Sequence, residues 1–405
     1  MKKLLIISPC AFHNKVGQAG HKTLNFYVSK FSVNFDVTVL SLADYWKKDF
    51  ELMIQDHPNV QFIANRKKKN ILQRLRDSLL MHKIYPFVKM FNPIYYLSNG
   101  LNKRRLHYLL KKIDNPEQLN YVLVEFTSMI FQYNVIQSYF PHAKFIASCH
   151  DVSFLSVERW LNSNKVWMSK KNYYQSFKEL EIKALNQYDL VVPHNVKDAE
   201  LLRREVSFSS EKLHVINPYF DRYTVKATNP DGIVFFGAMK RKENLDSLYW
   251  FLQNVWKEVS ESHQPDLKLY VVGGGDTDSL KLICEKYKNV VVTGFVLDPT
   301  PYFNKSFAMV VPLQYGAGIK VKSIEALAAG IPLISNQIGI EGIPATKGSD
   351  YLHCEKPAEW IDSILEITEN RELFLLLSQN GKKLTDEKFN LEKSYQDYKS
   401  RINSL

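Results

Sequence analysis

The sequence has few cysteines and no long apolar run. Its 405 residues include only four cysteines (Cys10, Cys149, Cys284 and Cys354), and their spacing fits neither a metal site nor close disulfide pairing. We therefore expect reduced thiols in a cytoplasmic protein. No run of about 18 apolar residues occurs, so we expect no helix that spans a bilayer. The apolar run after Lys3 is too short for a signal peptide and better suits a buried strand.

Acidic residues are nearly absent from residues 65–112, where thirteen Lys and Arg side chains are opposed only by Asp77. Apolar and aromatic residues are interleaved with these charges, as on proteins that bind an anionic membrane surface. A solvated basic face on an ordinary helix pair and a nucleic-acid surface are the alternatives, and we favour the membrane over nucleic acid. The segment is longer than a normal crossover, so we interpret it as an insertion.

Strands and helices are expected to alternate along both halves of the chain. This order predicts an α/β fold with two doubly wound, Rossmann-like domains, and 405 residues with 45% apolar content can fill two cores. The Pro-, Gly- and Asn-rich stretch 219–232 is the expected linker. It separates an N-terminal domain, 1–218, from a C-terminal domain that begins at residue 233. Within the N-terminal domain, we expect residues 213–216 to form the strand that closes its sheet, and Asn195 to cap the helix that follows it.

Residues 308–335 predict a strand, a glycine turn, a helix and a second strand. The apolar run 308–312 suits a buried parallel strand. The turn Gly316-Ala317-Gly318-Ile319 lets backbone approach a ligand closely, and the apolar spacing of residues 321–329 predicts the helix. Backbone amides at the helix start form an anion site, with Lys320 and Lys322 beside it.

A second anion site is predicted at residues 233–246. An apolar strand over 233–236 ends at Gly237, and the basic turn Lys240-Arg241-Lys242 leads into a helix. Further along, Asp276 and Asp278 follow a strand and three glycines. They could hold a metal ion, but we favour a helix N-cap and a first-turn acid.

In the N-terminal half, polar residues follow three predicted strands. The loop with Gly17 and Gly20 follows strand 3–8, Glu125 follows strand 121–124, and His150-Asp151 follows strand 144–147. Open α/β sheets bind ligands at the carboxyl ends of their strands. The alternatives are a plain strand–helix turn for the glycine loop and a packing or surface role for His150.

These motifs resemble the family-four group of retaining glycosyltransferases, which have the GT-B fold. In that family, a Glu, seven residues and a second Glu mark the turn and helix at this place. Here the second matches Glu325, whereas the first falls on Ala317. The sequence Gly-Ala-Gly-Ile-Lys-Val-Lys over 316–322 resembles a subgroup with a glycine-rich, basic turn. Without the resemblance, Glu325 would be an ordinary solvated helix residue.

The resemblance implies two domains facing a cleft, a C-terminal domain that ends near residue 385, and a helix over 386–405 that crosses back to the first domain. It implies a metal-independent, retaining transferase of the hexosyltransferase type, with no cofactor. The donor would be a UDP- or GDP-sugar. The acceptor would be a glycan or a lipid-linked glycan in cell-surface polysaccharide or glycoconjugate synthesis, at the inner membrane face.

The resemblance also implies roles for individual residues. His150 contacts the transferred sugar, Asp151 orients His150, and Glu325 binds the ribose hydroxyls. The family's two cationic diphosphate ligands fall on Ala238 and Glu243 here, so their role passes to the basic turn, chiefly Lys242. The remaining donor-site residues are Gly237, Lys240, Arg241, Val296, Gly316, Ala317, Gly318, Ile319, Lys320 and Lys322, and the acceptor loop contributes Gly17, Gly20 and Glu125.

Two alternative functions remain at this point. A non-catalytic GT-B-like subunit that stabilises a partner transferase would explain the departures at Ala238, Glu243 and Ala317. A nucleotide-sugar epimerase shares the fold, but the carboxylate-rich site it requires is not evident in the sequence.

Overall fold

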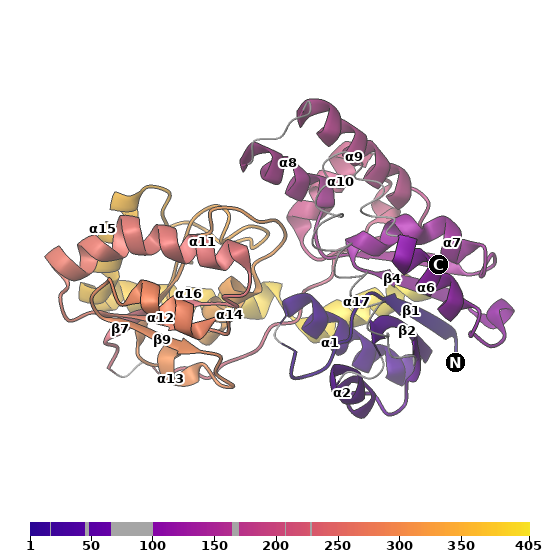
Figure 1. Cartoon of the computed structure of the whole chain (residues 1–405), viewed down its shortest axis with the longest axis horizontal. Helices are drawn as coiled ribbons and strands as arrows, with labels where there is room; N and C mark the ends of the chain where they lie inside the picture. Colours follow the sequence, from indigo (N-terminus) through magenta and orange to yellow (C-terminus); the bar gives the residue numbers. More distant parts are fainter. Residues whose placement is uncertain (17, 45–47, 66–99, 164–169, 207, 227–228) are drawn as a thin grey trace. The chain divides into compact units, whose positions relative to one another are not determined.

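The structure is a computed structural model of the whole chain, and it describes all residues except 17, 45–47, 66–99, 164–169, 207 and 227–228. The chain forms two units (Figure 1). The first comprises Met1–Tyr219 and Glu392–Leu405, and the second comprises Phe220–Leu391. The second unit thus begins within one residue of the predicted linker start. The chain re-enters the first unit six residues later than residue 386, where the crossing helix was expected.

The first unit contains a six-stranded parallel sheet with strand order β3-β2-β1-β4-β5-β6. Its strands are β1 (Lys3–Ser8), β2 (Asp36–Asp44), β3 (Gln61–Asn65), β4 (Tyr121–Glu125), β5 (Lys144–Cys149) and β6 (Leu190–Pro193). Residues 213–216, expected to close this sheet, do not form a strand. They run beside β6 with a single bridge between Leu213 and Val191.

Helices flank this sheet. They are α1 (Ala19–Asn34), α2 (Lys48–Asp56), α6 (Gly100–Leu110), α7 (Tyr133–Gln137), α8 (Ser153–Ser163), α9 (Lys170–Leu185), α10 (Val196–Val206) and α17 (Leu391–Asn403). The predicted cap of α10 is confirmed, because Asp198 N–H donates to Asn195 Oδ1 over 2.8 Å. The aromatic rings of α17 pack on those of α1, which ties this last helix to the first unit.

The second unit contains another six-stranded parallel sheet, in the order β12-β11-β10-β7-β8-β9. Its strands are β7 (Gly232–Phe236), β8 (Lys268–Val272), β9 (Val290–Gly294), β10 (Ser306–Val311), β11 (Leu333–Ser335) and β12 (Leu352–His353). Its α-helices are α11 (Lys242–Phe251), α12 (Thr277–Cys284), α13 (Thr300–Phe303), α14 (Val321–Ala329), α15 (Pro357–Glu369) and α16 (Arg371–Lys388).

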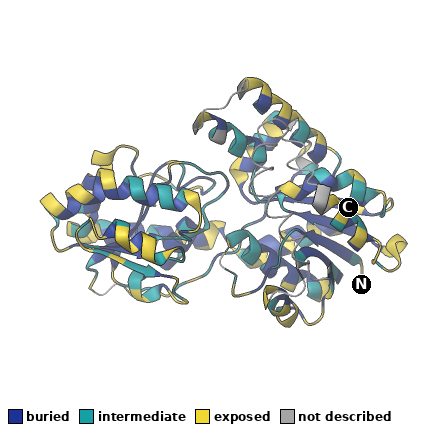
Figure 2. Cartoon of the chain, in the orientation of Figure 1, coloured by how far each residue is buried: buried dark blue, intermediate teal, exposed yellow. Residues whose placement is uncertain are grey.

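In both units the strands are the buried layer, and the helices expose their outer faces (Figure 2). The central strands β1 and β7 are apolar and almost wholly buried, as expected for parallel strands covered on both faces. The predicted fold class of two Rossmann-like α/β domains is therefore confirmed.

Most of the predicted basic insertion, residues 66–99 within 65–112, lies outside the described residues. The described end of the segment is α6, which covers the first sheet. Leu106 and Leu109 are buried in the core, and Arg105 Nη2 donates to Ala43 O over 2.8 Å. Within the described ranges, no helix is both long enough and apolar enough to cross a membrane.

Candidate functional site

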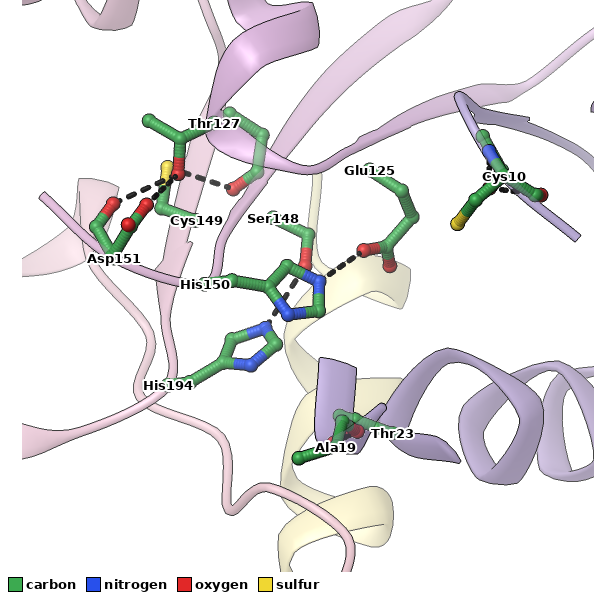
Figure 3. A network of polar contacts seen from close by, with 12 residues as sticks. Cys10, Ala19, Thr23, Glu125, Thr127, Ser148, Cys149, His150, Asp151 and His194 are labelled. Carbon is green, nitrogen blue, oxygen red and sulfur yellow. Dashed lines mark hydrogen bonds and ion pairs between the residues drawn. The ribbon is translucent and has the colours of Figure 1, made fainter. Parts of the chain in front are cut away.

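The carboxyl ends of β4, β5 and β6 bring Glu125, His150 and His194 together in the first unit (Figure 3). His150 Nε2 lies 3.0 Å from Glu125 Oε2, and His194 Nε2 lies 3.0 Å from Ser148 Oγ. The two imidazole rings are 4.1 Å apart between centroids. Parallel strands end at one edge of their sheet, so residues far apart in sequence become neighbours there.

Phe126 and Gly20 fix the position of the His150 ring. The Phe126 ring stacks on it at a centroid distance of 4.1 Å with an interplanar angle of 3°. Phe126 has φ of +72°, which is sparsely populated for a non-glycine residue and is typical of functional sites. A Cβ atom at Gly20, near the start of α1, would lie 2.9 Å from His150 Nδ1. A side chain at residue 20 would therefore displace the ring or block Nδ1.

Burial changes the proton affinities in this cluster. Burial, together with the neighbouring His21, lowers the pKa of His150 to about 3. Burial also raises the pKa of Glu125 to about 7, against the opposing effects of His194 and the hydrogen bonds from Ser148 and Phe126. His150 is therefore a neutral imidazole near pH 7, with one nitrogen that donates and one that accepts.

The predicted partner of His150, Asp151, lies elsewhere. Its carbonyl oxygen and its Oδ1 accept from Thr127 Oγ1 over 2.8 and 3.1 Å. The side chain that contacts the His150 imidazole is instead Glu125, which was predicted only as an acceptor-loop residue. His194 follows β6 as His150 follows β5, so the same strand-end argument would have identified it. Gly17 lies outside the described residues.

The second unit contains a basic corner, which we define as Gly237, Asn244 and Lys322. Lys322 Nζ donates to Asn244 Oδ1 over 2.8 Å, and Asn244 Nδ2 donates to Ala238 O over 2.9 Å. Lys322 Nζ lies 3.4 Å from the point that a Cβ at Gly237 would occupy. The first turn of α14 therefore meets the turn between β7 and α11.

The Lys322 ammonium has no carboxylate partner, since no described acidic residue forms an ion pair with it. Burial, together with the charges of Arg241 and Lys320, lowers its pKa to about 7. An anion in this corner would restore the charged form of the ammonium, and the backbone amides at the start of α14 would also favour a negative charge.

Lys320 contacts the backbone of the glycine turn, and its predicted role in donor binding stays a prediction. Its ammonium donates to Ala317 O over 3.1 Å and also to Gly318 O. It lies 3.6 Å from Glu341 Oε2, and both side chains are largely buried. Gly318 adopts φ of +72° within this turn. Lys320 thus holds the glycine turn from inside, together with Glu341, which the sequence did not indicate.

The exposed basic turn differs from the corner. Lys240, Arg241 and Lys242 are exposed, and the Lys242 ammonium pairs with Asp246. Asp246 Oδ2 also accepts from Tyr315 Oη over 2.6 Å, so this pair ties α11 to the glycine turn. The cation that reaches Gly237 is therefore Lys322. The diphosphate role of Lys242 stays a prediction.

Glu325 lies one turn after Lys322 and is only 6% exposed, which excludes the solvated-residue alternative. Its Oε1 accepts from Asp221 N–H over 3.2 Å. Val296 is half-buried between the exposed Phe295 and Leu297, in the loop that follows β9.

The predicted helix cap at Asp276 is confirmed by its hydrogen bond from Ser279 N–H. In the part of the chain that the structure describes, no group of three or more His, Cys, Asp or Glu residues could hold a metal ion.

Comparisons with known proteins agree with the geometry of both units. Residues 230–370 match the family model "Glycosyl transferases group 1". An uncharacterized 44.6 kDa protein in the cps region of Klebsiella pneumoniae is 23% identical over 164 residues, which span 38% of this chain and 41% of that protein.

Solved structures share the whole fold. Anabaena Alr3699/HepE in complex with UDP and glucose has a TM-score of 0.67 at 13% identity, over 100% of both chains. Sucrose-phosphate synthase from Thermosynechococcus elongatus has a TM-score of 0.68 at 16% identity, over 100% of this chain and 99% of that one.

Proposed function

From the match of residues 230–370 to the group 1 glycosyl transferases and the fold shared with HepE, we propose that this protein is a retaining glycosyltransferase. It transfers a hexose from a UDP- or GDP-sugar to a glycan or lipid-linked acceptor. A role in cell-surface polysaccharide synthesis is supported by the relative encoded in a cps region.

The observation that carries this proposal is the basic corner. Lys322 is a partly buried cation without a described carboxylate partner, at the start of a helix and beside a glycine turn. In our proposal the diphosphate of the donor occupies this corner. Negative charge grows on the diphosphate as the glycosidic bond breaks, and a preorganised cation with helix amides stabilises it. These groups can do so without a metal ion.

We assign the other roles by resemblance together with position. Glu325 is buried one helical turn from Lys322, where we propose that it accepts hydrogen bonds from the ribose hydroxyls. His150 contacts the transferred sugar. Gly316 to Ile319 and the backbone of Val296 contact the donor, while Gly20 and Glu125 belong to the acceptor side.

The test measures nucleoside diphosphate release from a panel of UDP- and GDP-sugars. We expect Glu325→Ala and Lys322→Gln each to lower kcat/KM by about 100-fold, because each removes a charged hydrogen-bonding group from the donor site. Glu372→Ala, an exposed position on α16, is the matched control and should match wild type. Equal turnover in all four proteins would contradict the proposal. No donor binding by wild type would favour the non-catalytic subunit.

We also propose that the basic segment 65–112 binds an anionic membrane surface and so brings the enzyme to a lipid-linked acceptor. The proposal rests on the thirteen basic residues opposed by one acid. Neutralising Lys67, Lys68, Lys103 and Arg104 should abolish flotation with vesicles that contain anionic lipid. Unchanged flotation would refute this part alone and leave the transferase assignment intact.

A further inference from the structure

We propose that Glu125 is a positioning residue that keeps His150 in the tautomer with its proton on Nε2, so that His150 Nδ1 accepts a hydrogen bond from a substrate hydroxyl. The proposal rests on the proposed function and goes beyond it, because it states which atom of His150 meets the ligand and what sets its character. The contact that carries it is the 3.0 Å separation of His150 Nε2 from Glu125 Oε2.

The groups around Glu125 decide which partner donates. The backbone N–H of Phe126 and the hydroxyl of Ser148 favour the ionised form of its carboxylate. A backbone N–H can only donate, so the side chain at residue 125 must offer acceptor atoms to it. An ionised carboxylate can accept from Phe126, Ser148 and His150 together, which places the His150 proton on Nε2.

His194 extends the same chain of hydrogen bonds. Its Nε2 lies 3.0 Å from Ser148 Oγ (Figure 3). When the Ser148 hydroxyl proton points to Glu125, the Ser148 oxygen accepts a hydrogen bond from the N–H at His194 Nε2. Both imidazoles then carry their proton on Nε2. A chain of donors that ends on one carboxylate also strengthens each of its members.

His150 Nδ1 is the free end of this chain. None of the described residues hydrogen-bonds to it. The ring keeps 15% of its side-chain surface exposed and is held by the stacked Phe126 ring. Gly20 supplies the room, since any Cβ there would sit 2.9 Å from Nδ1. Nδ1 is therefore an oriented acceptor with space beside it for a hydroxyl group.

The proton affinities of the cluster give this arrangement a pH range. Several groups surround the Glu125 carboxyl. They are His150 and Ser148 from β5, His194 from β6, Cys10 from the loop after β1, Tyr27 from α1 and Tyr398 from α17. His21, from α1, faces His150. Burial raises the pKa of Glu125 to about 7. Below that pH the carboxyl group is protonated and donates a hydrogen bond to His150 Nε2, so the neutral imidazole carries its single proton on Nδ1.

The first experiment measures the tautomer directly, on the full chain labelled with ¹⁵N-histidine and without substrate. His150→Gln identifies the His150 signals. At pH 8 we expect a protonated Nε2 and an unprotonated Nδ1. In Glu125→Gln an NH₂ group replaces one oxygen, and we expect it to donate to His150 Nε2 and reverse the tautomer, because the nearby Phe126 N–H favours the remaining oxygen. A protonated Nδ1 in wild type at pH 8 would overturn the proposal.

The second experiment measures activity against pH. We expect the activity of wild type to rise as the pH increases through 7. Glu125→Gln should lower kcat by about 10- to 100-fold and should not show this rise. If Glu125→Gln lowered activity but kept the wild-type pH profile, the role of Glu125 would be merely structural and the proposal would be overturned. Because the tautomer measurement needs no donor, wild type that turns over no donor would refute the proposed function and leave the tautomer result intact.

Gly20→Ala tests the position of the ligand. Alanine favours a helix more than glycine does, which offsets part of the cost of its close contact with the His150 ring. We therefore expect a melting temperature close to that of wild type and a KM for donor or acceptor at least tenfold higher. Val33→Ala, at an exposed position of the same helix, is the control. An unchanged KM in Gly20→Ala would show that no ligand reaches His150 Nδ1.

Discussion

At the scale of single residues, burial changes what charged groups can do. Lys322 and Glu125 are both largely removed from water, and in each case burial is the largest cause of the shift in pKa toward 7. Both groups therefore change their charge near pH 7. Their partners are neutral hydrogen-bonding groups, Asn244 for Lys322 and the His150 imidazole for Glu125.

Donor binding should depend on pH through Lys322. Its pKa of about 7 means that the ammonium is charged below pH 7 and loses its proton above it. Since the charged form binds the diphosphate, affinity for UDP-glucose should fall by up to about tenfold per pH unit above 7. Lys322→Gln should bind more weakly at pH 6 and show no such decline. Isothermal titration from pH 6 to 9 measures this, and a parallel decline in both proteins would contradict it.

Stability in acid should depend on His57, which lies outside the candidate site. His57 Nε2 lies 2.6 Å from Asn25 Oδ1, and burial lowers the pKa of His57 to about 4. Between pH 6.5 and 4 the unfolded chain binds a proton that the folded chain does not, so stability is lost as pH falls through this window. The loss should reach about 3 kcal/mol.

His57→Gln lacks this group and should lose less stability than wild type between pH 7 and pH 4.5. Urea denaturation of both proteins, followed by circular dichroism at the two pH values, measures the difference. An identical loss in the two proteins would show that His57 is not responsible.

At the scale of elements, two turns of the second unit pack back to back. The turn after β8 passes so close to the turn after β7 that a Cβ at Gly273 would lie 1.9 Å from Gly237 O. Gly273 also has φ of +141°. Position 273 needs glycine, because its Cα faces the backbone of Gly237 there. Since Gly237 belongs to the basic corner, this contact holds the backbone of that corner in place.

Gly273→Ala should therefore destabilise the second unit by at least about 3 kcal/mol, from strain in φ and from the collision with the Gly237 carbonyl. Gly348→Ala is the matched control. Gly348 has φ of +74° but nothing within 4 Å of a new Cβ, so only the strain in φ remains, about 1 kcal/mol. Thermal unfolding of both variants measures the difference, and equal costs would show that the close approach is relieved cheaply.

At the scale of the whole molecule, the chain ends in the unit where it began. Helix α17 belongs to the first unit. The rings of Tyr395 and Tyr398 lie 5.7 and 5.4 Å from the Phe31 ring, and Tyr27 Oη lies 2.9 Å from Ser394 Oγ. The stability of the first unit therefore depends on residues that lie more than 350 positions along the chain from those they pack on.

Truncation after Asn390 should unfold the first unit and leave the second unit folded. The truncation exposes the aromatic face of α1, which costs several kcal/mol of buried apolar area. Hydrogen exchange should show loss of protection in β1 and β4 and retained protection in β7 and β8. Ser400→Ala, at an exposed position of α17, should leave both units protected. Retained protection of β1 in the truncated chain would contradict the prediction.

Much of this fold was predictable because its signals are local. Apolar runs followed by glycine or polar turns identified the strands, and the caps at Asn195 and Asp276 lie three residues from the amides that they accept from. The segment 213–216 was predicted wrongly as a strand, since an apolar run indicates burial without showing that a ladder forms. Glu325 was placed correctly in α14, but its burial and its contact with Asp221 were not visible in the sequence.

The sequence by itself determined the two Rossmann-like units and the residues that end their strands, because strand periodicity and turn chemistry act over a few residues. Only the tertiary structure decided which of those residues meet. Glu125 and His150 are 25 positions apart, Asn244 and Lys322 are 78 apart, and both pairs form where the ends of parallel strands and helices converge. No local pattern contains these distances, so only the structure identified Glu125 as the side chain at the His150 imidazole and Lys322 as the cation beside Gly237.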